Sequence, residues 1–228
     1  MEDRIKYALK NFLSDTFRYD SNLSTYELLE IDKLGKSRLI VNVGTSENIC
    51  VKNYDDFPKW RIINNSKRLH MNKCVDHFIF KQNSLGIWEL HIFEMKTTIG
   101  FKTWSDIKYK LRSSYLSIKA IAVYLGIIIR DENITAYTTY ENDEKMSISN
   151  MTDPKVALPR VGGKAIDVKK DEWDAGFINV PVIVSESNPY DFYTAIRLRH
   201  SKIPMNRAEN GFLENMISLE NKMTELFL

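Results

Sequence analysis

The chain has 228 residues, enough for one large domain or two small ones, and its 43% hydrophobic content with nine glycines and six prolines is typical of an ordinary globular protein. No apolar run approaches the roughly 20 residues that span a membrane, and two cysteines (Cys50 and Cys74) are too few for a disulfide framework or a zinc site. The start, MEDRIKYALKNFL, lacks a cleavable signal pattern, so we expect a cytoplasmic protein without a membrane partner. The net charge of +2 does not by itself indicate a nucleic-acid binder.

The first part of the chain predicts two helices followed by strands. Apolar residues recur at helical spacing over residues 2–18. Ser24 and Thr25 precede Glu27 and two leucines, which predicts a second, short helix with a capped start. Over residues 37–65 the runs RLIVNVG, NICVKNY and KWRIINN are separated by turn-forming GTSE and DDFP. We expect these runs to form the sheet into which the next segment inserts.

Residues 74–96 predict a β-hairpin. Aromatic and β-branched residues flank the turn-like KQNSLG on both sides. Side chains alternate faces along a strand, so Asp76 shares a face with Phe78 and Phe80. In the second strand one face carries Trp88, Leu90, Ile92, Glu94 and Lys96. Glu94 and Lys96 therefore extend an apolar stripe, where charges are costly unless they are paired or bind a metal.

The clearest predicted helix runs from about Thr103 to Tyr124 and is stopped by Gly126. Its apolar stripe consists of Trp104, Ile107, Leu111, Ser114, Ile118, Ala122 and Leu125. A different face carries Lys108, Arg112, Tyr115 and Lys119, which could follow a phosphate backbone or could simply be solvated. With the basic run before the hairpin, the candidate nucleic-acid-binding residues are Lys67, Arg68, Lys102, Lys108, Arg112, Tyr115 and Lys119.

The remainder of the chain predicts mainly strands and one more helix. Residues 126–140 are expected to form two strands around 131–133, and the polar residues 141–164 a long loop. Strand-like sequence returns at AIDVKK and FINVPVIVSES, while 190–204 is typical of either a helix or a strand. Residues 207–227 predict an amphipathic helix with apolar residues at heptad spacing: Phe212, Met216, Leu219, Met223 and Leu226. This helix packs either on its own domain or in a homodimer contact.

The order Asp76, seventeen residues, then Glu94-Met95-Lys96 resembles the PD-(D/E)XK nuclease superfamily over roughly residues 60–126. The sequence departs from that pattern at Val75, where the proline that gives the motif its name would stand. The resemblance implies an α/β (α+β) protein with a restriction-endonuclease-like central mixed β-sheet flanked by helices. We expect one nuclease-like domain over 1–228, with a core of about 1–140 and a C-terminal extension over 141–228.

The resemblance further implies a phosphodiesterase that uses Mg²⁺ or Mn²⁺. Asp76 and Glu94 would hold the metal with the Met95 carbonyl, and Lys96 would position or activate the attacking water. An early acid often adds to such sites, and Glu27 and Glu30 are the candidates here. The expected substrate is DNA in preference to RNA, in restriction or phage defence. Three alternatives are an ordinary hairpin with solvated charges, a non-catalytic nucleic-acid-binding or scaffold module, and an RNA-directed or nucleotide-activated nuclease.

Overall fold

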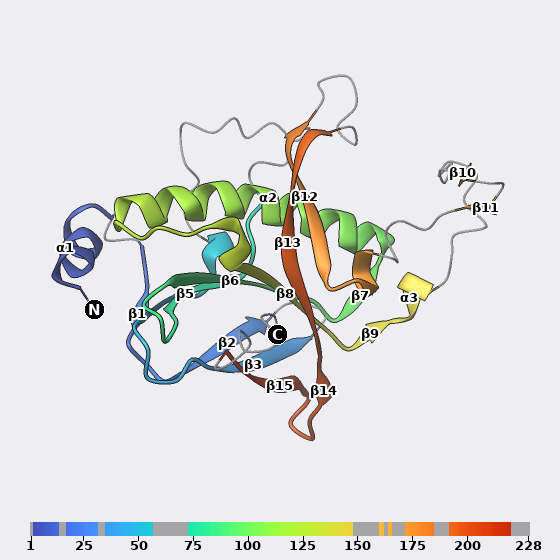
Figure 1. The fold of residues 1–228 in the computed structure, drawn as a ribbon. Coiled ribbons are helices and arrows are strands. Elements are labelled where there is room, and N and C mark those ends of the chain that lie inside the picture. The colour runs from blue at the N-terminus through green and yellow to red at the C-terminus, as the bar shows by residue number, and fades with distance from the viewer. Residues whose placement is uncertain are drawn as a thin grey trace.

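A computed structural model describes residues 2–13, 17–31, 35–56, 73–147, 160–161, 164–165, 172–184 and 192–219. The protein has a mixed α/β architecture with a seven-stranded sheet, a four-stranded sheet and, in this part of the chain, one long helix. The long helix and the smaller sheet lie on opposite sides of the seven-stranded sheet (Figure 1). The expected central mixed sheet is therefore present.

The seven-stranded sheet has the order β1-β4-β5-β6-β8-β13-β12. Its strands are β1 (Asp20–Ser21), β4 (Asn48–Val51), β5 (His77–Gln82), β6 (Trp88–Met95), β8 (Ile134–Tyr140), β12 (Phe177–Val184) and β13 (Phe192–Pro204). The predicted hairpin is confirmed: β5 and β6 pair antiparallel, with His77 opposite Phe93. β6 then pairs with β8 in parallel, and β8 with β13 in parallel. The parallel pair β6–β8 requires a crossover connection, which the long helix supplies.

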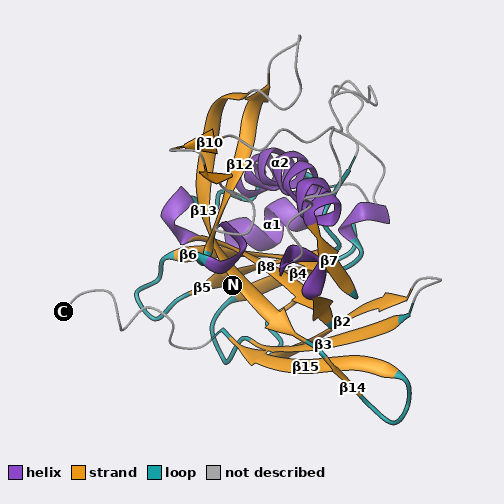
Figure 2. Ribbon diagram, turned by 90° about the vertical axis from the view of Figure 1, so that its right-hand side faces the viewer, coloured by secondary structure: helices purple, strands orange, loops and turns teal. Residues whose placement is uncertain are grey.

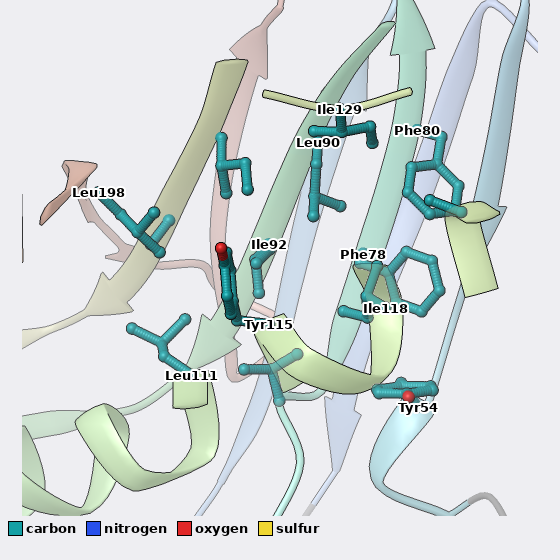
Figure 3. Close-up of a cluster of buried hydrophobic side chains, with 14 of the residues drawn as sticks. Tyr54, Phe78, Phe80, Leu90, Ile92, Leu111, Tyr115, Ile118, Ile129 and Leu198 are labelled. Atoms are coloured by element: carbon teal, nitrogen blue, oxygen red, sulfur yellow. The ribbon is translucent and has the colours of Figure 1, made fainter. Parts of the chain in front are cut away.

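The long helix, α2 (Phe101–Tyr124), confirms the predicted amphipathic stripe. Trp104, Ile107, Leu111, Ile118 and Ala122 are all at most 2% exposed. They belong to one buried cluster with Phe78, Phe80, Leu90 and Ile92 of the sheet. Figure 3 shows Leu111 and Ile118 of the helix beside these sheet residues. Gly126 follows the helix with a positive φ of 71°, a conformation that glycine adopts without strain.

The four-stranded sheet covers the other face of the large sheet (Figure 2). Its order is β14 (Asn206–Arg207), β15 (Phe212–Ser218), β3 (Lys36–Asn42) and β2 (Thr25–Ile31). Leu28, Leu39 and Leu213 from this sheet pack with Ile79 and Phe93 of the large sheet. The strand β3 was predicted correctly but belongs to this sheet rather than to the sheet of the hairpin. Because β15 pairs with β3 in parallel, the C-terminal extension and the N-terminal core share one sheet.

Two predicted helices are wrong. Residues 25–31 form β2, in which Tyr26 and Leu28 are buried while Thr25, Glu27 and Leu29 are exposed. The described part of 207–227 forms β14 and β15, and the heptad residue Met216 is 63% exposed. In both segments the pairing with β3 outweighs the local helical pattern, because one face of each strand is buried on the large sheet. Met223 and Leu226 of the predicted heptad lie outside the described residues, and the homodimer contact stays a prediction.

Two further segments, 190–204 and 126–140, differ in how far they follow the expected strands. Residues 190–204 contain the strand β13, and 131–133 is a 3₁₀ turn (η2, Asp131–Asn133) with a strand on its C-terminal side only. The first helix is α1 (Asp3–Asn11). The remaining elements are η1 (Tyr54–Asp56), β7 (Thr98–Gly100), β9 (Asn142–Asp143), α3 (Glu144–Ser147), β10 (Arg160–Val161) and β11 (Lys164–Ala165). The predicted run at 59–65 and most of AIDVKK lie outside the described residues. None of the helices in the described ranges is long and apolar enough to cross a bilayer.

Candidate active site

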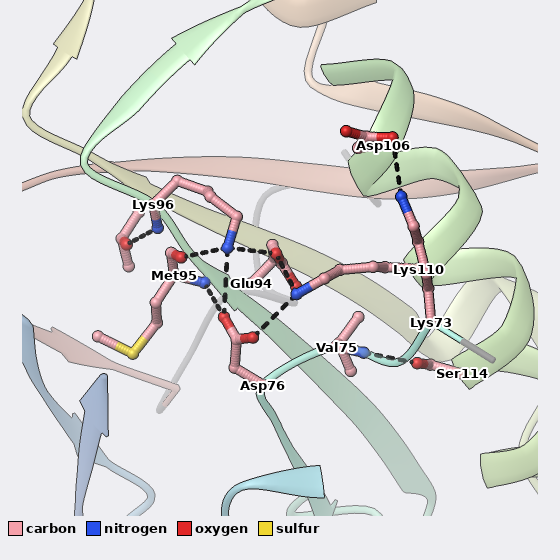
Figure 4. A network of polar contacts seen from close by, with 10 residues as sticks. Lys73, Val75, Asp76, Glu94, Met95, Lys96, Asp106, Lys110 and Ser114 are labelled. Atoms are coloured by element: carbon pink, nitrogen blue, oxygen red, sulfur yellow. Dashed lines mark hydrogen bonds and ion pairs between the residues drawn. The ribbon is translucent and has the colours of Figure 1, made fainter. Parts of the chain in front are cut away.

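The antiparallel pairing of β5 and β6 brings the two predicted carboxylates together. Asp76 directly precedes β5, and Glu94 is the penultimate residue of β6. Continuing the register one residue past the His77–Phe93 pair places Asp76 opposite Glu94. The alternation of side chains directs both carboxylates to the α2 side of the sheet, as the sequence predicted (Figure 4).

Lys96 joins the two carboxylates. Its Nζ lies 2.6 Å from Glu94 Oε1, 2.7 Å from the Met95 carbonyl oxygen and 3.9 Å from Asp76 Oδ2. The Met95 backbone N–H donates to Asp76 Oδ2 at 2.6 Å, which fixes that carboxylate against the end of β6. Glu94 is 0% exposed and Asp76 is 1% exposed. The structure therefore brings together the three residues of the predicted catalytic set and the Met95 carbonyl.

Lys110 of α2 is a member of this site that the sequence interpretation missed. Its Nζ lies 3.1 Å from Asp76 Oδ1 and 2.8 Å from Glu94 Oε1 (Figure 4). The Val75 backbone N–H donates to Ser114 Oγ at 2.9 Å, which ties α2 to the residue before Asp76. Lys110 lies three residues after Ile107 and four before Ser114, so its position beside the buried stripe was the available signal.

Burial and like charge shape the ionisation of the site. Burial raises the pKa of Glu94 to about 7, and the nearby Asp76 charge adds to that effect, while Lys96 and Lys110 oppose it. Burial alone would lower the pKa of Lys110, but Glu94 and Asp76 together raise it above its ordinary value. Lys110 is therefore a charged ammonium at neutral pH, held by two carboxylates.

Glu30 and Glu27, the candidates for a third acid, lie on opposite faces of β2. Glu30 lies half-buried on the inner face of β2, and burial followed by the Asp76 charge raises its pKa to about 7. Glu27 lies on the outer face and forms an ion pair with Arg38 at 3.5 Å. Asp55 of η1 also responds to Asp76, since burial and that charge raise its pKa. Glu30 is thus an acidic neighbour of the site, and Glu27 is not.

The oxygen atoms of the site match the ligands that Mg²⁺ and Mn²⁺ prefer. Glu94 Oε2 is buried and has no hydrogen-bond partner among the residues that the structure describes. An unpartnered buried carboxylate oxygen is costly, and a bound cation would remove that cost. Within the same residues no group of three or more His, Cys, Asp or Glu side chains is arranged to hold a metal. The fit is therefore to a cation held by two carboxylates and a carbonyl, with the remaining positions filled by water.

The predicted nucleic-acid-binding residues do not form one open basic face. Lys119 Nζ and Tyr115 Oη each lie 2.8 Å from Asp131 Oδ1, and Lys108 pairs with Glu172. Arg112 is 1% exposed, so its guanidinium does not reach an external phosphate in this conformation. Lys102 is exposed, whereas Lys67 and Arg68 lie outside the described residues.

Buried histidines near the sheet have structural contacts. His77 Nδ1 accepts a hydrogen bond from the Asn53 backbone N–H at 3.0 Å, and His200 Nε2 lies 3.0 Å from Thr138 Oγ1. Burial lowers the pKa of His77 to about 4 and that of His200 to about 3. Both imidazole rings are therefore neutral at physiological pH, as is expected of rings that are buried in the protein interior.

A scan against models of known protein families, a search of curated proteins and a search of solved structures return no match. The residues of this chain and their geometry therefore carry the functional argument alone.

Proposed function

We propose that this protein is a metal-dependent endonuclease that hydrolyses phosphodiester bonds in DNA, with a restriction-endonuclease-like fold. The observation that carries the proposal is the convergence of Asp76, Glu94 and Lys96 at one end of the β5–β6 pair, with both carboxylates buried. The central mixed sheet and the long helix after the Glu-x-Lys segment support the same resemblance.

Each residue has a role that follows from its contacts. Asp76 and Glu94 would hold the cation together with the Met95 carbonyl. When bound, such a cation polarises the phosphate and makes its bound water more acidic. The Lys96 ammonium lies beside both Glu94 and the Met95 carbonyl, where it can orient a water molecule and offset negative charge on the phosphate.

The test is cleavage of supercoiled plasmid and single-stranded DNA with Mg²⁺ or Mn²⁺, comparing the wild type with Glu94→Gln. The matched control is Glu89→Gln, because Glu89 lies on the same strand but on the opposite face, beside His91. We expect metal-dependent cutting that Glu94→Gln abolishes and Glu89→Gln retains, with circular dichroism showing that both variants fold. Cleavage that survives in folded Glu94→Gln would refute the assignment.

A second candidate is a non-catalytic nucleic-acid-binding module, and the contacts of Lys110 support its lack of a metal. Two ammonium groups face two carboxylates, so the cluster is electrically balanced without a metal. This candidate predicts salt-dependent DNA binding, no metal binding by calorimetry and no cleavage. Either metal binding or Glu94-dependent cleavage would exclude it.

A further inference from the structure

The Lys110 ammonium bridges the two carboxylates that the proposed metal requires. It reaches one oxygen on each side chain, Asp76 Oδ1 at 3.1 Å and Glu94 Oε1 at 2.8 Å. Lys96 differs because its closest contacts are Glu94 Oε1 and the Met95 carbonyl, and Asp76 is 3.9 Å away. Lys110 is therefore the closer of the two ammonium groups to Asp76.

The two carboxylates need a cation in this environment. Asp76 and Glu94 are almost fully buried, and two adjacent buried carboxylates repel each other strongly. A divalent ion and the Lys110 ammonium would draw on the same oxygens and would also repel each other at close range. Occupation of the site by one therefore opposes occupation by the other.

The two sides of the contact differ in their freedom to move. The Lys110 side chain is 21% exposed and has a flexible four-carbon stem, whereas Glu94 is fully buried on the end of a central strand. Withdrawal of the ammonium into solvent consequently changes less of the structure than withdrawal of the carboxylate.

We infer that Lys110 is a built-in counter-cation that occupies the divalent-cation position between Asp76 and Glu94, and that metal binds only as this ammonium withdraws. The inference rests on the proposed function for the identity of the competing ion. It assigns Lys110 an autoinhibitory role: it stabilises the metal-free protein and weakens metal binding.

The first experiment measures Mn²⁺ binding to the full chain by isothermal titration calorimetry. Lys110→Met removes the ammonium and keeps an unbranched side chain. Lys119→Met is the matched control, because Lys119 lies on the same helix and pairs with Asp131. We expect Lys110→Met to bind Mn²⁺ at least about tenfold more tightly than the wild type, and Lys119→Met to be unchanged. Equal or weaker binding by folded Lys110→Met, or no binding by any form, would overturn the inference.

The second experiment uses the wild type, so it does not depend on the folding of the variant. The lysines are acetylated with a limiting amount of an amine-reactive acetylating reagent, with and without Mn²⁺. Mass spectrometry then measures the labelling of each lysine. Metal should increase labelling of Lys110 several-fold and leave Lys119 unchanged. Labelling of Lys110 that does not respond to a saturating metal concentration would contradict the inference.

Cleavage separates this inference from the proposed function. Tighter metal binding by Lys110→Met without cleavage in any form would support the counter-cation and refute the nuclease. Glu94-dependent cleavage with unchanged metal affinity in Lys110→Met would support the nuclease and refute the counter-cation.

Discussion

The ion-pair cluster at the β5–β6 edge makes a quantitative prediction about stability. Lys110→Met leaves Asp76 and Glu94 buried with Lys96 as their nearest remaining ammonium. Glu94→Gln removes the carboxylate that contacts both lysines. Combining the two substitutions removes an ammonium and a carboxylate together, so the charge of the cluster is balanced again.

The expected cost follows from burial. Removing one partner of a fully buried ion pair costs about 3–5 kcal/mol. Lys110 retains 21% side-chain exposure, and Lys96 Nζ stays 2.6 Å from Glu94 Oε1, so we expect Lys110→Met to cost about 2–3 kcal/mol. The double variant should cost less than the sum of the single variants by about 0.5–3 kcal/mol, the range for directly interacting residues.

Urea unfolding followed by circular dichroism measures these free energies in metal-free buffer. In the wild type a pH of about 8 keeps Glu94 mostly ionised, because it lies above the pKa of about 7 that burial gives this residue. Lys119→Met serves as the control and should cost at most about 1 kcal/mol, since its pair with Asp131 is partly exposed. The reasoning fails if the effects of Lys110→Met and Glu94→Gln simply add, because additivity means that the two groups do not interact.

Three further predictions concern the surroundings of the site and the fold. At a pH of about 8, above the Glu30 pKa of about 7, Glu30→Gln should weaken Mn²⁺ binding by about three- to tenfold in calorimetry, because it removes a negative charge that acts on Asp76. Glu27→Gln should leave Mn²⁺ binding unchanged, and equal effects of the two substitutions would contradict the placement of Glu30 beside the site. Burial lowers the pKa of His200 from 6.5 to about 3, so its neutral form contributes stability above pH 6.5 that is lost as the pH falls toward 3. His200→Gln should reduce that pH dependence by up to about 1.4 kcal/mol per pH unit in urea unfolding, and an unchanged slope would exclude this origin. In urea unfolding, Leu213→Ala should destabilise the protein by about 2–5 kcal/mol and Met216→Ala by at most about 0.5 kcal/mol, since Leu213 is 1% exposed and Met216 is 63% exposed. A larger effect of Met216→Ala would contradict the strand β15 and favour the predicted helix, in which Met216 lies on the apolar face.

The sequence by itself predicted the hairpin, the stripe of α2 and the meeting of Asp76 with Glu94. These features depend on local rules: turn residues between two β-rich runs, alternation along a strand and recurrence along a helix. Antiparallel pairing of neighbouring strands then follows from the short turn, so the two carboxylates meet without any distant contact.

The strand β15 depends on pairing across the whole chain, whereas β2 pairs antiparallel with β3, the next strand in the sequence. Both segments are short, and their apolar residues fit a helical as well as a strand pattern. β15 pairs with β3, whose residues lie far away in the sequence, and no local signal encodes that partner. The buried large-sheet face selects the strand, because only a strand places Leu28 and Leu213 together against Ile79 and Phe93.

The tertiary packing of the long helix also determines which lysine reaches the two carboxylates. The sequence places Lys108, Lys110 and Lys119 on one basic helix, but not the depth at which each meets the sheet. Packing of α2 on β5 and β6 places Lys110 beside the two carboxylates. Lys108 instead pairs with Glu172, and Lys119 pairs with Asp131. Arg112 is buried. The physical reason is that the desolvation and pairing of a charge depend on what covers it, and the cover comes from segments distant in the sequence.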